Sequence, residues 1–192
     1  MATMTSELLA VLLSTSFTVC SRPGALSGLG RAAPSDVAQV IGDHAMIDLI
    51  RDLIPFLSQD LLTIEDVVAR IGSIAHDPGV PMPIDLDPVD TGVRSARLSR
   101  YPDSGLPYVL AIEPKLNVRP TVAALKSVLG DYHQALTDRG RPIEVVFLPP
   151  TAGACWKVVV VAELVPNVVS LESAAVTRVA LRRDPHHREN CA

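Results

Sequence analysis

Residues 93–113, VRSARLSRYPDSGLPYVLAIE, decide the fold. The central part, Tyr101 to Leu106, is typical of a tight turn, because proline presets φ, aspartate hydrogen-bonds its own backbone and glycine accepts a positive φ. The flanking residues are rich in β-formers. The stretch therefore predicts a hairpin between Arg94–Arg100 and Pro107–Glu113.

Downstream of this hairpin the pattern predicts one helix and then a meander. Pro120 to Leu136 is typical of the domain's main helix, with proline in the first turn. Strands are expected at 143–148, 155–165 and 175–183. Val158 to Val161 is apolar on both faces, which predicts a central strand covered by the 120–136 helix on one side and N-terminal helices on the other.

The half of the chain before the hairpin predicts helices. Asp36 and Val37 open a short one that ends at Gly42, and an amphipathic segment follows from Ala45 to Phe56, with Pro55 expected to end or bend it. Thr63 caps a third helix, Asp66 completes a capping box, and Gly72 is expected to stop the helix in the left-handed conformation. Between His76 and Thr91, four prolines predict an extended rim loop on the surface.

The fold class that follows is α+β, with N-terminal helices followed by a mainly antiparallel sheet (hairpin, helix, meander) packed on helices. Residues 20–34 are rich in Gly, Ser and Pro, which is typical of a linker. We therefore expect an N-terminal helix and linker over 1–34 and a single α+β domain over 35–192. Within that domain, residues 35–75 form the helical part and 93–184 the sheet part.

The first residues carry an apolar run, Leu8 to Leu13, followed by Cys20. No Lys or Arg precedes the run and Glu7 lies where a signal peptide has positive charge, so a cytoplasmic protein is expected, with export through a weak N-terminal signal as the alternative. The run is too short for a membrane span. The odd number of cysteines, 3, also favours a reducing setting.

Composition narrows the class of function. The chain has 192 residues, 48% hydrophobic and 20% charged, which is typical of a folded globular protein. Its net charge is −4, and its basic residues are scattered apart from Arg182-Arg183 near the end, which argues against a nucleic-acid partner. No phosphate-binding loop, nucleophile elbow or His-Glu-x-x-His motif is present in the sequence.

Few residues are candidates for catalysis or for metal binding. Asp85, Asp87 and Asp90 are candidate ligands for a divalent cation, because hard cations take several oxygens from one short segment. The spacing lacks the glycine and closing glutamate of a calcium loop, which favours a solvated acidic loop instead. No cofactor is expected.

Cys155 is a candidate nucleophile with His133 as its base, since a reactive thiol needs a neighbour that lowers its pKa. Its place at the start of the most apolar strand favours a buried, inert cysteine instead. Glu163 is a carboxylate in that otherwise apolar strand, and a salt bridge to Arg178 is expected if the last two strands are neighbours.

The absence of a catalytic motif and a mean hydropathy of +0.29 favour a soluble, non-enzymatic interaction protein that uses a sheet face or the Pro-rich rim. Its partner would be another protein or a second copy of the chain. The order of elements resembles small immunity-type proteins of high-GC bacteria, which implies a protein partner. The alternative is a small-molecule binding or enzyme domain whose pocket lies between sheet and helices.

Overall fold

The structure is a computed structural model that describes residues 34–135, 141–151, 155–166 and 168–185, with side chains from residue 44 onward. The predicted N-terminal helix and linker therefore lie outside the described residues, apart from Pro34. Cys20 and the apolar run before it lie outside them as well.

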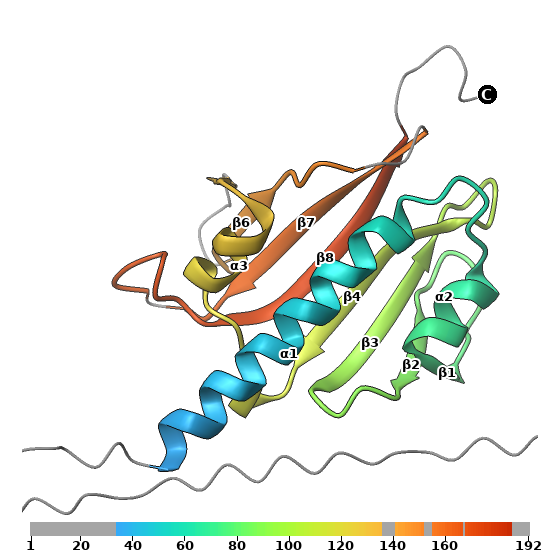
Figure 1. Cartoon of the computed structure of the whole chain (residues 1–192). Helices are drawn as coiled ribbons and strands as arrows, with labels where there is room; N and C mark the ends of the chain where they lie inside the picture. Colours follow the sequence, from blue (N-terminus) through green and yellow to red (C-terminus); the bar gives the residue numbers. More distant parts are fainter. Residues whose placement is uncertain (1–33, 136–140, 152–154, 167, 186–192) are drawn as a thin grey trace, which may run out of the picture. The chain divides into compact units, whose positions relative to one another are not determined.

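An eight-stranded antiparallel sheet forms the body of the described chain, in the order β1-β2-β3-β4-β8-β7-β6-β5 (Figure 1). The α+β class with a mainly antiparallel sheet is confirmed. The predicted hairpin is β3–β4, with Leu98 opposite Leu110. The strands are β1 (Gly72–His76), β2 (Ile84–Pro88), β3 (Val93–Arg100), β4 (Pro107–Pro114), β5 (Tyr132–Gln134), β6 (Glu144–Phe147), β7 (Trp156–Leu164) and β8 (Val176–Pro185).

The α-helices of the described chain lie together on one face of the sheet (Figure 1). They are α1 (Pro34–Leu57), α2 (Ile64–Ile71) and α3 (Val122–Leu129), and a short 3-10 turn, η1 (Leu116–Val118), precedes α3. The prediction that helices cover both faces of β7 is wrong. Apolar residues on both faces of a strand suggest two covering layers, but the second face of β7 carries two valines between Lys157 and Glu163 and lies beside the ion pairs of Arg178 and Arg182.

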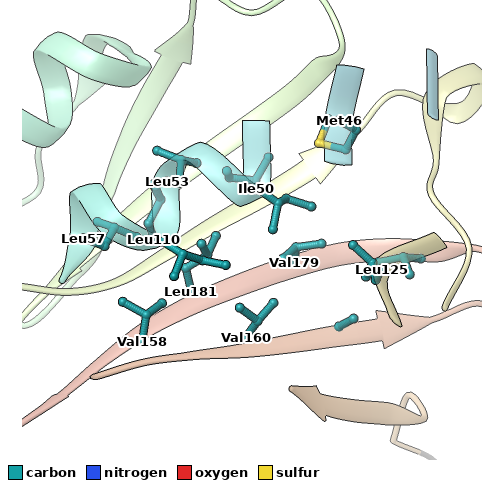
Figure 2. Close-up of a cluster of buried hydrophobic side chains, with 14 of the residues drawn as sticks. Met46, Ile50, Leu53, Leu57, Leu110, Leu125, Val158, Val160, Val179 and Leu181 are labelled. Atoms are coloured by element: carbon teal, nitrogen blue, oxygen red, sulfur yellow. The ribbon is translucent and has the colours of Figure 1, made fainter. Parts of the chain in front are cut away.

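The first N-terminal helix is longer than predicted. A single helix, α1, runs through both Gly42 and Pro55, where the sequence predicted two helices. A glycine inside a helix costs only about 1 kcal/mol, and from Met46 to Leu57 α1 lays a continuous apolar stripe on the sheet. Figure 2 shows Met46, Ile50, Leu53 and Leu57 against side chains of β4, β7 and β8. All four are at most 1% exposed.

The predicted helix over Pro120–Leu136 is wrong in length. Thr121 caps α3, and the helix ends at Leu129 because Gly130 adopts φ 88°, a conformation that glycine takes readily. The chain then turns back as β5 and pairs with β6. The longest helix of the described residues is thus α1, with 24 residues against 8 in α3.

Helix α2 begins as predicted. The Thr63 hydroxyl accepts from the Asp66 amide, and the Asp66 carboxylate accepts from the Thr63 amide, so the capping box is confirmed. The end of α2 differs from the prediction, because Gly72 has φ 166° and is extended rather than left-handed. Glycine is required there for space, because a Cβ at Gly72 would lie 1.9 Å from the carbonyl oxygen of Asp87.

The proline-rich stretch between His76 and Thr91 is only partly a loop. Residues 77–83 join β1 to β2, while Ile84–Pro88 forms β2, which pairs with β1 on one side and β3 on the other. The prediction that this stretch runs extended over the surface without forming a central strand is therefore wrong for Ile84–Pro88. Its prolines do not interrupt the ladder, because Pro83 precedes β2 and Pro88 is its last residue.

Candidate functional site at the sheet edge

The three predicted metal ligands lie on or just after β2 without converging on a site. The Nε of Arg97 donates to the Asp85 carboxylate at 2.9 Å, and the Gly92 amide donates to Asp90 at 2.7 Å. Asp87 is exposed. Within the described residues, no three His, Cys, Asp or Glu side chains are grouped so that they could hold a metal ion.

The predicted nucleophile and base are not brought together. His133 is exposed on β5 and lies opposite Val146, which lies opposite Val161 on β7. Cys155 is six positions back along that strand, which at about 3.3 Å a residue is about 20 Å away. Cys155 is half-buried and disulfide-bonded, so its sulfur is not the thiol that a nucleophile requires.

The sheet face away from the helices carries charged pairs around a narrow apolar strip. Arg178 donates to Glu163 at 2.7 Å, so the predicted salt bridge is confirmed. Arg182 pairs with Asp184, and its backbone lies opposite Val159, which is only 3% exposed. At this central position the face therefore offers little apolar area to a partner.

The edge of the sheet at β1 differs from that face. One row of helix-side residues crosses all eight strands in register: Ile74, Leu86, Ala96, Ile112, Val179, Ala162, Val145 and Gln134. The members from Leu86 to Val145 are at most 4% exposed, whereas Ile74 is 50% exposed. The hydrophobic core therefore continues to the edge strand and ends there uncovered.

The same hairpin carries more exposed apolar side chains. Val80 and Met82, in the loop between β1 and β2, are 51% and 57% exposed. With Ile74 they make up three of the nine large hydrophobic residues exposed in the described part of the chain. Exposed apolar side chains that gather on one element mark an interaction surface more often than scattered ones do.

Strand β1 lacks most of the protection usual at a sheet edge. Its sequence, GSIAH, contains no Lys, Glu, Asp or Pro, the residues that normally blunt an edge. Its one irregularity is a register shift between Ile74 and His76. Because β1 ends the sheet that the described residues form, one row of its backbone N–H and C=O groups faces away from β2, on the side where another strand could pair.

The opposite edge of the sheet, at β5, is protected because the strand is short and carries a polar side chain. Strand β5 has only three residues, and Gln134 ends the core row there with an exposed polar side chain. Short edge strands pair poorly with other chains. The two edges are thus unequal, and β1 is the one suited to strand addition.

Several contacts hold β1 in place. Gly72 follows α2 directly and allows the close approach of β1 to β2. Arg100 on β3 donates two hydrogen bonds to Asp77, just beyond β1, at 2.7 and 3.2 Å. These bonds lower the pKa of the Asp77 carboxyl, helped by the Gly79 amide. The edge is therefore ordered before a partner arrives, which reduces the entropy lost on binding.

Sequence reasoning missed a buried arginine on β8, near the middle of the sheet. Arg183 on β8 is 1% exposed. Its Nε donates to the carbonyl oxygen of Leu57 at 2.7 Å, and its Nη atoms donate to those of Gln59 at 2.8 Å and Pro107 at 3.1 Å. It also lies over the Trp156 ring at 4.2 Å. Arg183 thus caps the end of α1, which has no basic residue in its own last turn.

A cavity of about 330 Å³ lies between α1, α2 and the sheet. Its floor is apolar, with Leu49, Ile71 and Ile112, and its rim carries Asp52, Arg70 and Asp90. Of the predicted site residues, only Asp90 lines it. An adjoining cavity of about 560 Å³ shares Ala45, Val89 and Asp90 and extends to Lys115.

Comparison of the chain with protein-family models, with curated proteins and with solved structures finds no match. No helix among the described residues is long and apolar enough to cross a bilayer. The assignment of a function therefore depends on the geometry of the chain itself.

Proposed function

We propose that this protein is a non-enzymatic interaction protein that binds a protein partner by adding the partner's strand to β1. The observation that carries the proposal is the exposed end of the core row at Ile74. A strand placed beside β1 covers that side chain and pairs the outward backbone groups of Gly72–His76. This refines the expectation of a sheet-face or rim interface to the sheet edge beside the rim.

Strand addition has a simple chemistry. Backbone hydrogen bonds supply affinity that does not depend on sequence, and the pockets beside alternate side chains supply specificity. Here the added strand would meet Ile74 on the helix side, and Ser73 and His76 on the other side. Residues facing Ile74 in a partner are therefore expected to be apolar, while those on the opposite side are expected to be polar.

Affinity capture with matched variants tests the proposal. Tagged wild-type chain, Ile74→Lys and Val169→Lys are each used to capture proteins from an extract of the organism that encodes the chain. Val169 is fully exposed in the loop between β7 and β8, which are four or more strands away from β1 in the sheet, so it controls for adding a lysine. We expect a protein retained by the wild type and Val169→Lys and lost with Ile74→Lys. Equal capture by all three would refute the proposal.

A second candidate function is favoured by the cavity between α1, α2 and the sheet, because such clefts with a few charged groups over an apolar floor are typical ligand sites. Its volume, about 330 Å³, lies at the small end of that class. Ligand screening by thermal shift, comparing wild type with Leu49→Trp to fill the cavity, tests it. A compound that stabilises the wild type and not the variant would support a small-molecule function.

A further inference from the structure

We infer that the strand added to β1 is β1 of a second copy of this chain, antiparallel to the first across a twofold axis near Ile74. The inference rests on the proposed function and names its partner. The pairing would join the two eight-stranded sheets into one continuous sheet, with the helices of both copies on the same face.

A twofold interface requires a surface that is complementary to itself. With Ile74 at the centre, each Ile74 lies opposite its copy, and each Ser73 lies opposite Ala75. None of these residues is charged, so no like charges meet. Directly opposite side chains in an antiparallel pair lie about 5 Å apart. The two half-exposed isoleucines therefore cover one another, and the core row runs unbroken from Leu86 of one copy to Leu86 of the other.

The helix layer permits this approach. Helix α2 packs over β1 and β2 on the same side as Ile74. Arg70 and Ile71 line the cavity between α2 and α1, and Val68 packs against the hydrophobic core. Neighbouring strands are about 5 Å apart, so the line midway between β1 and β2 lies about 5 Å from a twofold axis at the outer side of β1. A helix above that line and its copy are then about 10 Å apart, a normal packing distance for two helices.

The shape of the edge also sets the size of the assembly. Pairing is short, because β1 has only 5 residues and its register with β2 shifts between Ile74 and His76. An interface of one short strand and one helix flank is small, so we expect a dimer that dissociates in the micromolar range. The assembly stops at two copies, because the contact uses the β1 edge of both chains and leaves only the β5 edges at the two ends of the joined sheet.

Sedimentation velocity of the full chain, from about 1 µM to about 500 µM, tests the inference. We expect the mass to rise from 20.5 kDa toward twice that value. Ile74→Lys should weaken the dimer at least about tenfold, since it places two cations together at the axis. Val169→Lys should leave the dimer unchanged.

Hydrogen exchange of the same samples locates the interface. Amides of residues 73–75 should exchange more slowly as the wild-type concentration rises, and those of β5 should not change. A chain that stays monomeric throughout would refute self-association, and so would a dimer insensitive to Ile74→Lys. In the monomeric case, a protein captured by the wild type and lost with Ile74→Lys would still support strand addition by a different partner. The two proposals therefore fail separately.

Discussion

Replacing Arg183 by methionine should be among the most destabilising single changes in this domain. Methionine keeps the apolar stem but removes all three hydrogen bonds to the carbonyl oxygens of Leu57, Gln59 and Pro107. Two of these bonds are fully buried, and an unsatisfied buried carbonyl costs about 1–3 kcal/mol. The α1 end also loses the only buried cation that faces its terminal carbonyl groups, among the described residues.

The magnitude follows from these opposing effects. Two orphaned carbonyl groups cost about 2–6 kcal/mol, and the lost contact with the Trp156 ring adds about 1 kcal/mol. Against this, the variant no longer buries a charge: desolvation lowers the pKa of Arg183, which shows that burial opposes its charged form. We expect a net loss of about 3 kcal/mol, or about 6–12 °C in Tm for a domain of this size.

Chemical denaturation of Arg183→Met, Arg183→Lys and Arg182→Met measures the effect. Arg182 is the matched control, because it lies next in sequence with its side chain 41% exposed and paired to Asp184. Its replacement should cost less than about 1 kcal/mol. Arg183→Lys should be intermediate, since an ammonium cannot reach three carbonyl groups in the planar arrangement of a guanidinium. If Arg183→Met cost no more than Arg182→Met, the capping argument would be wrong.

Three further predictions concern the elements that position β1. Gly72→Ala should loosen β1, because the added Cβ would lie 1.9 Å from the carbonyl oxygen of Asp87. Hydrogen exchange of the amides of residues 72–76 should become faster, and unchanged exchange would contradict the prediction. Thr63→Ala removes the cap of α2 and should cost about 1 kcal/mol in urea unfolding, while Thr63→Ser should restore most of it. Hydrogen bonds from Arg100 hold the pKa of Asp77 below its ordinary value of 3.8, so the stability that Asp77 contributes is present above that value and lost as the pH falls below it. Asp77→Asn should therefore reduce the loss of stability as the pH falls below 3.8, and an identical pH profile would exclude this ion pair.

Local signals in the sequence predicted the parts of the fold that short-range chemistry determines. The β3–β4 hairpin follows from the turn residues between Tyr101 and Leu106, and the start of α2 follows from the capping box at Thr63. The Glu163–Arg178 pair followed once β7 and β8 were taken as neighbours. Each of these features depends on residues close in sequence or on a single strand pairing.

The other features of the fold depend on contacts between residues that are distant in the sequence, which local patterns do not predict. Gly42 and Pro55 marked helix ends, yet α1 continues through both, and around Pro55 the sheet buries its apolar stripe. The stretch GSIAH gave no sign of an edge strand, since strand order is set by pairing between distant segments. Arg183 did leave a signal: it follows Val179 and Leu181 at alternate positions on the core side of β8, where a charged residue requires buried partners.

The claim that β1 is the interaction edge is tested most directly by hydrogen exchange of the chain in its assembled state, whether with a second copy or with a captured protein. We expect the amides of Gly72–His76 to be slowed relative to the free chain, while those of Tyr132–Gln134 at the other edge are unchanged. Protection confined to the far face of the sheet, or to the cavity beside α1, would contradict the account.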